Sequence, residues 1–385
     1  MKITFFSNFL NHHQLYLSQE IINCGCDYTF VATDKIPQAT KSFGYEDMNE
    51  KYDFVLRTYE SDQNVQKAYK LALDSDVVIL GNADKEFVKE RLEQNKLTFI
   101  YAERLFKKGT YRRFIPTTRK TVNERFTKHN GKNLHVLAAS AYLALDLKLI
   151  GFKNPVYKWG YFPQVKEYEV KKLIDGKQNN PIKILWAGRF LKLKRTRDIL
   201  YLASKLKSNG YDFSMDIIGK GVCEQKLKQL VKKLNITDKV NFLGSMPSEK
   251  VREHMEKANI YLFTSNFHEG WGAVLNEAMN SGCAVVASHA IGSVPYLIKH
   301  GENGFIYKMG DINSLYGCVK ELIDNPQMMQ KFGEKAYYTL KDSWNPEIAA
   351  KRLVNMAQSL LSGNTYEYEQ DVLSKSQIIT QKYKR

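Results

Sequence analysis

Two glutamates enclose a glycine-containing stretch, EGWGAVLNE, which begins at Glu269 and ends at Glu277. On one continuous helix these acids would lie roughly 80° apart in angle and about 12 Å apart along the axis, so a shared helix face does not explain them. The surrounding residues instead predict a buried strand (260–265), a loop (266–272) and then a short helix. Glu269 then lies in the loop and Glu277 in the helix, and both can face a ligand at the carboxyl end of the strand.

The residues between the two acids predict an anion site. Gly270 and Gly272 let the backbone approach a ligand closely, and the helix that begins at Ala273 offers unpaired N–H groups to an anion. Because carboxylates repel phosphate, the two acids should contact hydroxyl-rich parts of the ligand. A sugar nucleotide, with hydroxyls at both ends and a diphosphate between them, meets these requirements. The alternative is that one acid belongs to an ordinary loop and the other to a solvated helix face.

A second cluster follows the strand predicted at 182–187, in the sequence AGRFLKLK. Arg189 and Lys194 lie at the carboxyl end of this strand, where two cations can clamp a diphosphate. Charge-assisted hydrogen bonds of this kind contribute roughly 1.5–3 kcal/mol each. A glycine loop in DIIGKG places Gly219 and Lys220 after another strand, which is weak evidence by itself.

Short apolar runs alternate with helical stretches along nearly the whole chain, and this pattern predicts parallel sheets covered on both faces. The expected strands are 3–7, 28–33, 53–58, 77–82, 97–102 and 136–140 in the first half, and 182–187, 215–219, 240–244, 260–265, 284–288 and 305–307 in the second. Each series starts a new sheet. The predicted fold class is α/β, with two doubly wound, Rossmann-like domains.

The polar stretch LIDGKQNNP, residues 173–181, predicts the boundary between an N-terminal domain (1–172) and a C-terminal domain (173–345). After the last strand the pattern is helical, and helices are expected at 311–324, 326–342 and 346–361. The remainder, 346–385, is expected to be a C-terminal helix followed by a polar tail.

The composition indicates a soluble protein. At 385 residues, 43% hydrophobic and 25% charged, the chain can form two or three globular domains. It has no run near the roughly 20 apolar residues of a membrane span, and it begins with a strand pattern rather than a signal peptide, so we expect a cytoplasmic location. The five scattered cysteines predict no disulfide framework. No metal site is predicted, because Cys24 and Cys26 lack a second pair and the Asp74–Ser75–Asp76 triplet precedes its strand.

Half of the net charge of +16 lies in residues 103–133, the basic segment, which holds ten Lys or Arg against two acids. Four aromatic residues are interleaved with these cations: Phe106, Tyr111, Phe114 and Phe126. One interpretation is a solvated basic surface, and a second is attraction to anionic lipid headgroups or to a phosphate-bearing acceptor. Nucleic-acid binding is disfavoured because no known motif accompanies the charge. We expect peripheral attachment to the inner face of the cell membrane.

Taken in order, the clusters resemble the retaining, metal-independent glycosyltransferases of the GT-B architecture. More narrowly, they are similar to the large bacterial group marked by glutamate, seven residues, glutamate (family 4-like, of capsule and surface-glycan type). The resemblance runs from about Ile182 to Trp344 and includes AGRF…K, IIGKG, VNFLGSMPSEKV, EGWGAVLNE, GENGFIY and DSW. In the N-terminal half it is weaker and is carried by LAASAYLALDLKLIGFKNPVYKWGYFP, which contains Ser140.

The resemblance implies two domains facing an interdomain cleft, with the acceptor on the N-terminal domain, the donor on the C-terminal domain and the last helix crossing back to the N-terminal domain. Arg189 and Lys194 would hold the donor diphosphate, Glu277 the ribose hydroxyls, and Glu269 the donor sugar. Further donor contacts would come from Gly270, Trp271, Gly272, Ala273, Gly219 and Lys220. No metal and no cofactor other than the donor substrate are implied.

The sequence departs from the family pattern at two places in the donor half. IGSVPYL places Tyr296 where the family has an acid, and GKG replaces Gly-Asp-Gly, which puts Lys220 beside the donor site. In the N-terminal half, the loop SNFLNHHQ lacks the usual glycines but holds Asn11, His12 and His13. These three residues are candidates for contacts to the acceptor or donor. Their alternative role is that of hydrogen-bonded polar loop residues.

The function implied is transfer of a hexose-type sugar, with retention, from a nucleotide sugar to a glycan or a lipid-pyrophosphate-linked glycan acceptor in cell-surface polysaccharide synthesis. Two alternatives stay open. The first is an epimerase or phosphorylase of the same fold, and the second is a non-catalytic glycan-binding protein.

Overall fold

The computed structural model describes residues 1–37, 46–177, 180–364, 367–380 and 382–383. The chain divides into two compact units. Unit 1 contains Met1–Gln164 and Trp344–Thr380, and unit 2 contains Val165–Ser343 together with the described residues at the C-terminal end.

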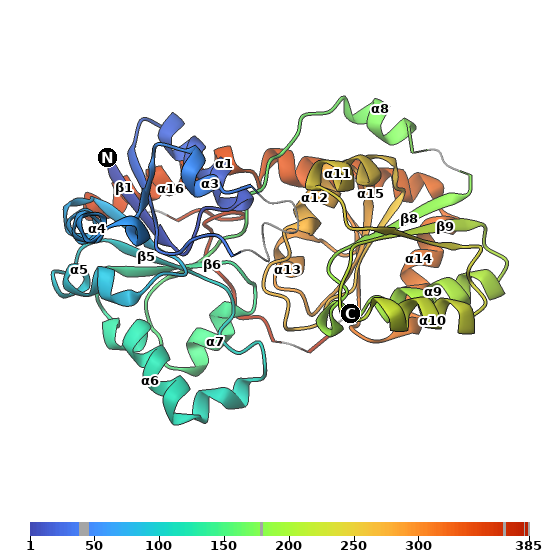
Figure 1. Cartoon of the computed structure of the whole chain (residues 1–385), viewed down its shortest axis with the longest axis horizontal. Coiled ribbons are helices and arrows are strands. Elements are labelled where there is room, and N and C mark those ends of the chain that lie inside the picture. Colours follow the sequence, from blue (N-terminus) through green and yellow to red (C-terminus); the bar gives the residue numbers. More distant parts are fainter. Residues whose placement is uncertain (38–45, 178–179, 365–366, 381, 384–385) are drawn as a thin grey trace. The chain divides into compact units, whose positions relative to one another are not determined.

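The described part of unit 1 is built on a parallel seven-stranded sheet in the order β3-β2-β1-β4-β5-β6-β7 (Figure 1). Its strands are β1 (Lys2–Ser7), β2 (Asp27–Ala32), β3 (Val55–Arg57), β4 (Val77–Leu80), β5 (Thr98–Ala102), β6 (Leu134–Ala138) and β7 (Val156–Lys158). The helices around it are α1 (His12–Asn23), α3 (Met48–Lys51), α4 (Asp62–Asp74), α5 (Lys89–Glu93), α6 (Pro116–Arg125), α7 (Leu143–Leu149) and α16 (Pro346–Leu361).

The described part of unit 2 contains a parallel six-stranded sheet in the order β10-β9-β8-β11-β12-β13. Its strands are β8 (Ile182–Ala187), β9 (Phe213–Ile218), β10 (Val240–Gly244), β11 (Ile260–Phe263), β12 (Ala284–Ser288) and β13 (Phe305–Tyr307). Its helices are α8 (Val170–Asp175), α9 (Thr196–Ser208), α10 (Glu224–Lys233), α11 (Ser248–Lys257), α12 (Val274–Asn280), α13 (Val294–Leu297), α14 (Ile312–Asp324) and α15 (Pro326–Asp342).

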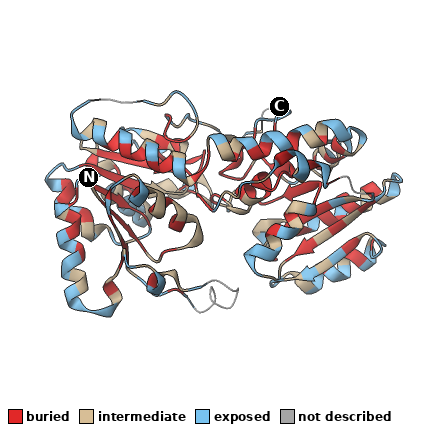
Figure 2. Ribbon diagram, turned by 90° about the horizontal axis from the view of Figure 1, so that it is seen from above, coloured by how far each residue is buried: buried red, intermediate tan, exposed pale blue. Residues whose placement is uncertain are grey.

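Both sheets are doubly wound, as the apolar runs predict. Every residue of β4 (VVIL), β11 (IYLF) and β12 (AVVAS) is buried, because helices cover both faces of a parallel sheet. Figure 2 shows the central strands in the colour of buried residues, while the helices turn exposed faces outward. The expected strands all form. The structure adds β7, a strand of three residues that the sequence analysis missed.

The division between the units falls at Gln164, eight residues before the expected domain boundary at 172. The reason is α8, which overlaps the start of the polar stretch at 173–181 and packs in unit 2. Val170 and Ile174 of α8 form a buried cluster with Tyr337 of α15. The polar stretch therefore lies within unit 2 rather than between the units.

Helix α16 packs on α1 and belongs to unit 1. Its start follows from the sequence, because Pro346 suits the first helical turn and the Asn345 side chain accepts a hydrogen bond from the Ile348 N–H at 2.8 Å. Among the residues that the structure describes, no helix is long and apolar enough to cross a membrane.

Candidate functional site

Strand order brings the two predicted clusters of unit 2 together. β8 pairs directly with β11, with Ile184 opposite Ile260 and Leu185 opposite Tyr261. The connections that leave these two strands run to helices α9 and α12, so the order of the sheet reverses between them. Open parallel sheets bind ligands at the carboxyl ends of the strands that flank such a switch point. The loops after β8 and β11 both begin there.

Hydrogen bonds join the two loops. The Asn266 N–H donates to the Leu193 carbonyl at 2.9 Å, and the Thr264 hydroxyl donates to the Lys194 carbonyl at 2.7 Å. The same hydroxyl accepts a hydrogen bond from the Trp186 indole N–H at 3.1 Å, which ties the loop to β8. The positions of Lys194 and of the residues just before Glu269 are therefore coupled.

Lys194 and Glu269 form an ion pair, with 2.6 Å between Nζ and Oε2. Both side chains are largely buried, at 15% and 14% exposure. Arg189 is exposed and forms no ion pair with any residue in the described ranges. The sequence predicts that the three side chains share one site, but it does not predict that Lys194 and Glu269 bind each other.

Glu277 lies one turn into α12 and is partly buried. Its carboxylate makes no hydrogen bond or ion pair with a described side chain. Desolvation raises the pKa of Glu277 from 4.5 to about 6, although the Arg252 charge opposes the shift. A half-buried carboxylate without a protein partner is well suited to accept hydrogen bonds from ligand hydroxyl groups.

Close packing, and not only ligand binding, requires a glycine in the loop after β11. Gly272 has φ +81°, and a Cβ atom there would lie 2.3 Å from the Phe263 ring. Next to it, Trp271 is fully buried, and its indole N–H donates to Asn276 Oδ1 at 2.9 Å. The helix that follows begins at Val274 and is only seven residues long. Gly270 is buried, whereas Ala273 is half-buried.

We predict that Gly272→Ala lowers the free energy of unfolding by about 2 kcal/mol or more. The alanine would have to adopt a left-handed backbone conformation, and its Cβ atom would clash with the buried Phe263 ring. Gly317→Ala is the matched control, since a Cβ atom on Gly317 in α14 meets nothing within 4 Å. This control should be neutral or stabilise by up to about 1 kcal/mol. Urea unfolding of the three proteins measures the difference, and equal stabilities would contradict the packing account.

The second glycine loop also has a structural reason. A Cβ atom on Gly219 would lie 2.0 Å from the Gly188 carbonyl oxygen, and one on Gly221 would lie 2.8 Å from the Phe190 backbone. The Phe190 N–H donates to the Lys220 carbonyl at 2.9 Å, so the loops after β8 and β9 lie against each other. The Lys220 side chain is exposed.

The segment that carries Tyr296, in place of the family acid, contacts the glutamate loop. The Ser293 hydroxyl donates to the Trp271 carbonyl at 2.7 Å, and the rings of Tyr296 and Trp271 lie 6.2 Å apart. The Tyr296 ring thus lies near the glutamate loop.

Unit 1 contains a pocket of roughly 780 Å³ at the carboxyl ends of β1, β4 and β5. Asn11 and His13 line it, whereas His12 does not, although the two histidine rings lie 5.0 Å apart. The His13 ring stacks on Tyr161 at 3.9 Å, and burial lowers the pKa of His13 well below its usual value. The lining also includes residues that the sequence motifs do not point to, among them Tyr161, Glu103, Arg125 and the threonines of α6.

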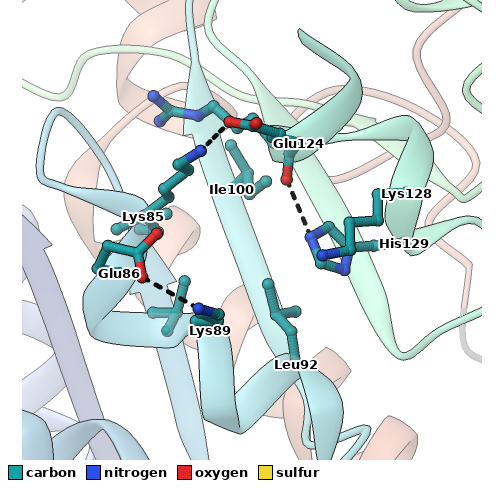
Figure 3. Close-up of a pocket in the computed structure, with 11 residues that line it drawn as sticks. Lys85, Glu86, Lys89, Leu92, Ile100, Glu124, Lys128 and His129 are labelled. Atoms are coloured by element: carbon teal, nitrogen blue, oxygen red, sulfur yellow. Dashed lines mark hydrogen bonds and ion pairs between the residues drawn. The ribbon is translucent and has the colours of Figure 1, made fainter. Parts of the chain in front are cut away.

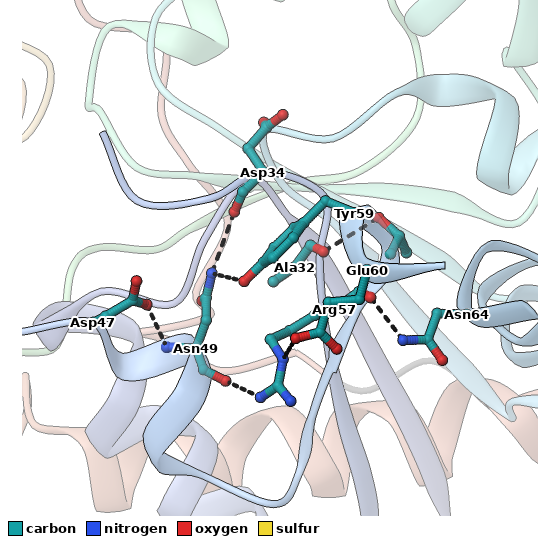
Figure 4. Close-up of polar contacts among 9 residues, drawn as sticks. Ala32, Asp34, Asp47, Asn49, Arg57, Tyr59, Glu60 and Asn64 are labelled. Carbon is teal, nitrogen blue, oxygen red and sulfur yellow. Dashed lines mark hydrogen bonds and ion pairs between the residues drawn. The ribbon is translucent and has the colours of Figure 1, made fainter. Parts of the chain in front are cut away.

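A polar network supports the loop that carries Asn11 and His13. Buried Asn49 accepts a hydrogen bond from the Leu10 N–H at 2.9 Å through Oδ1. Its Nδ2 donates to the Asp34 carbonyl and to the Tyr59 hydroxyl, both at 3.2 Å (Figure 4). The loop after β1 is therefore fixed by a side chain from α3. In the described ranges, no group of three or more His, Cys, Asp or Glu side chains is placed to hold a metal ion.

Residues 168–339, slightly less than half of the chain, match the family model described as Glycosyl transferases group 1. This segment therefore carries a group 1 glycosyltransferase domain and contains both clusters of unit 2.

Two curated relatives match the chain in part. It is 27% identical over 164 residues to the N-acetyl-alpha-D-glucosaminyl L-malate synthase of Bacillus anthracis, covering 43% of this chain and 42% of that protein. It is 29% identical over 153 residues to the N-acetylgalactosamine-N,N'-diacetylbacillosaminyl-diphospho-undecaprenol 4-alpha-N-acetylgalactosaminyltransferase of Campylobacter jejuni, covering 40% of each protein. The chain thus spans less than half of the length of either relative.

The likeness in fold extends over both units. The crystal structure of Anabaena Alr3699/HepE in complex with UDP superposes with a TM-score of 0.70 at 16% identity, covering 93% of this chain and all of that one. The fold class predicted from the sequence, with two Rossmann-like domains as in GT-B proteins, is confirmed.

Proposed function

We propose that this protein is a metal-independent, retaining glycosyltransferase that moves a sugar from a nucleotide-diphosphate sugar to a glycan or lipid-linked glycan in cell-surface polysaccharide synthesis. The observation that carries the proposal is the arrangement at the switch point of unit 2. There, two cations and two carboxylates follow the adjacent strands β8 and β11. The group 1 match over 168–339 supports a transferase, and the UDP in the HepE complex supports a nucleoside diphosphate donor.

In the proposed reaction, the bond between the anomeric carbon and the diphosphate oxygen breaks, and a bond to the acceptor oxygen forms on the same face of the sugar. The leaving diphosphate takes the acceptor proton. Negative charge grows on the diphosphate in the oxocarbenium-like transition state, and Arg189 and Lys194 stabilise it. Since an ammonium group has three hydrogens, Lys194 can hold Glu269 and a phosphate oxygen at the same time.

The two acids bind the hydroxyl groups at the two ends of the donor. Glu277, which lacks a protein partner, accepts hydrogen bonds from the ribose. Glu269, held by Lys194, lies beside the donor sugar. Protein cations then neutralise the diphosphate, the task that a divalent ion performs in metal-dependent transferases. The protein requires no cofactor in this proposal.

Release of nucleoside diphosphate from a panel of nucleotide sugars, in the presence of a chelator, tests this function. A transferase releases nucleoside diphosphate, and the rate rises when a glycan acceptor is added. Epimerisation without release would favour an epimerase. Phosphate-dependent release of sugar phosphate would favour a phosphorylase. Glycan binding without turnover of any nucleotide sugar would favour a glycan-binding protein.

The acceptor is proposed to be lipid-linked and the protein to attach to the inner membrane face through the basic segment. The Campylobacter relative, whose name specifies a diphospho-undecaprenol-linked substrate, supports this assignment. Tyr111 and Phe114 are 62% and 71% exposed, and the Arg113 guanidinium lies 4.3 Å from the Phe114 ring centre. Arg104, by contrast, is buried in an ion pair with Asp146 and belongs to the core rather than to the surface charge.

We predict that the double substitution Tyr111→Ser/Phe114→Ser reduces co-sedimentation with anionic vesicles at least tenfold. The substitutions remove two aromatic rings whose apolar area would otherwise enter the membrane interface. The double substitution Tyr201→Ser/Tyr338→Ser removes two exposed aromatic residues of unit 2 and should have no effect. Added salt should weaken the binding of the wild type. Vesicle binding indifferent to salt, anionic lipid and these rings would contradict the attachment.

A further inference from the structure

Helix α6 forms one wall of the pocket in unit 1, and the side that faces the pocket is mostly polar. The helix contributes Thr117, Thr118, Thr121 and Arg125 at helical spacing, with Val122 as its one apolar lining residue. Val122 is the only buried residue of α6. A helix normally turns apolar residues toward the body of its domain. The hydroxyl and guanidinium groups of α6 instead line an open space large enough for a sugar-sized ligand.

Arg125 is a half-buried cation without a counter-ion. One Nη donates to the Gly81 carbonyl at 2.7 Å, while Nε is buried and has no hydrogen-bond partner. No described carboxylate pairs with Arg125, and desolvation lowers the pKa of its guanidinium. A cation removed from water in this way is costly unless an anion joins it.

The nearby acids are already engaged. Glu103, which also lines the pocket, pairs with Lys107 and accepts a hydrogen bond from the Tyr161 hydroxyl at 2.6 Å. Glu124, next to Arg125 in the sequence, pairs with Lys85, and these two residues line a second, smaller pocket that Arg125 also lines (Figure 3). Among the described residues, Arg125 therefore has no carboxylate partner, and its guanidinium lies 5.9 Å from the Phe126 ring centre.

We propose that this pocket binds the acceptor through an anionic group, a phosphate or a carboxylate, which pairs with Arg125 and accepts hydrogen bonds from the hydroxyls of Thr117 and Thr118. The inference rests on the proposed function and specifies the chemistry of the acceptor. A planar guanidinium is suited to both anions because its N–H groups match two oxygens at once. Neutral glycans would lack this interaction.

Ligand-observed NMR titration of the full chain tests the proposal. The probes are a hexose 1-phosphate, a hexuronate and the matching neutral methyl hexoside, added with saturating nucleoside diphosphate so that the donor site is filled. We expect at least one anionic probe to bind about tenfold or more tightly than the neutral probe. Preference for phosphate alone or for uronate alone identifies which anion the acceptor carries.

Arg125→Gln should abolish this preference, and Arg125→Lys should keep part of it. Arg119→Gln is the matched control, since Arg119 lies on the same helix, is exposed and does not line the pocket. Unchanged thermal unfolding and nucleoside diphosphate affinity show that the variants are folded. Equal binding of charged and neutral probes, or equal losses in Arg119→Gln and Arg125→Gln, would overturn the proposal. Failure of the wild type to bind any nucleoside diphosphate would instead count against the proposed function.

Discussion

Replacing Glu277 by glutamine is expected to stabilise the protein while weakening its binding of nucleotide sugars. The folded protein holds the Glu277 proton up to about pH 6, whereas the unfolded chain releases it near pH 4.5. Folding stability therefore falls as pH rises between these values, and the whole cost is present above pH 6. Glu277→Gln removes this cost, so it should raise the free energy of unfolding by up to about 2 kcal/mol at pH 7.5 and leave it unchanged below pH 4.5.

The same substitution removes the charged acceptor that the ribose hydroxyls require. We expect nucleotide-sugar affinity at pH 7.5 to fall about tenfold or more, as for other hydrogen bonds to charged groups. Calorimetric unfolding at pH 4.5 and 7.5, together with binding titrations, measures both effects. Glu334→Gln, which alters an exposed acid of α15, should change neither. Reduced stability with unchanged affinity would show that Glu277 is a structural residue.

Lys194→Met is expected to have the largest effect on turnover. It removes a cation that stabilises the departing diphosphate, a change that typically lowers kcat by about 10²–10³-fold. It also leaves the Glu269 carboxylate, only 14% exposed, without its partner. We therefore expect a loss of about 1–3 kcal/mol in the free energy of unfolding, somewhat less than for a fully buried pair.

The double substitution Lys194→Met/Glu269→Gln separates the two roles. Because it removes both charges, it should recover most of the stability without recovering turnover. Lys192→Met, at an exposed position in the same turn, is the control for the loss of one positive charge. Nucleoside diphosphate release and urea unfolding provide the two measurements. Near-normal turnover in Lys194→Met would show that this lysine only supports the fold.

That the two charged clusters of unit 2 adjoin was predictable, because local signals place each cluster at the end of a strand. Arg189 and Lys194 follow one buried strand, and Glu269 and Glu277 follow another. A doubly wound sheet places the carboxyl ends of its strands along one edge. The ion pair between Lys194 and Glu269 was not predictable, because no pattern relates side chains so far apart in the sequence. The boundary was misplaced because a polar stretch is no guide to where α8 packs.

The pocket of unit 1 was less predictable, because it also depends on contacts between residues far apart in the sequence. Arg125 lies among other cations in the basic segment, where its charge seemed part of an exposed surface. The threonine face of α6 has the composition of a solvated helix face. Only the tertiary structure shows that Arg125 and these threonines line a pocket. Tyr161, which stacks on His13, comes from a stretch with no motif of its own.

A crystal structure of the full chain with a bound nucleoside diphosphate, grown in the presence of a chelator, tests the central claim most directly. We predict that the diphosphate contacts Arg189 and Lys194 at the ends of β8 and β11, with the ribose hydroxyls on Glu277. A nucleotide bound elsewhere, with these side chains untouched, would contradict the assignment.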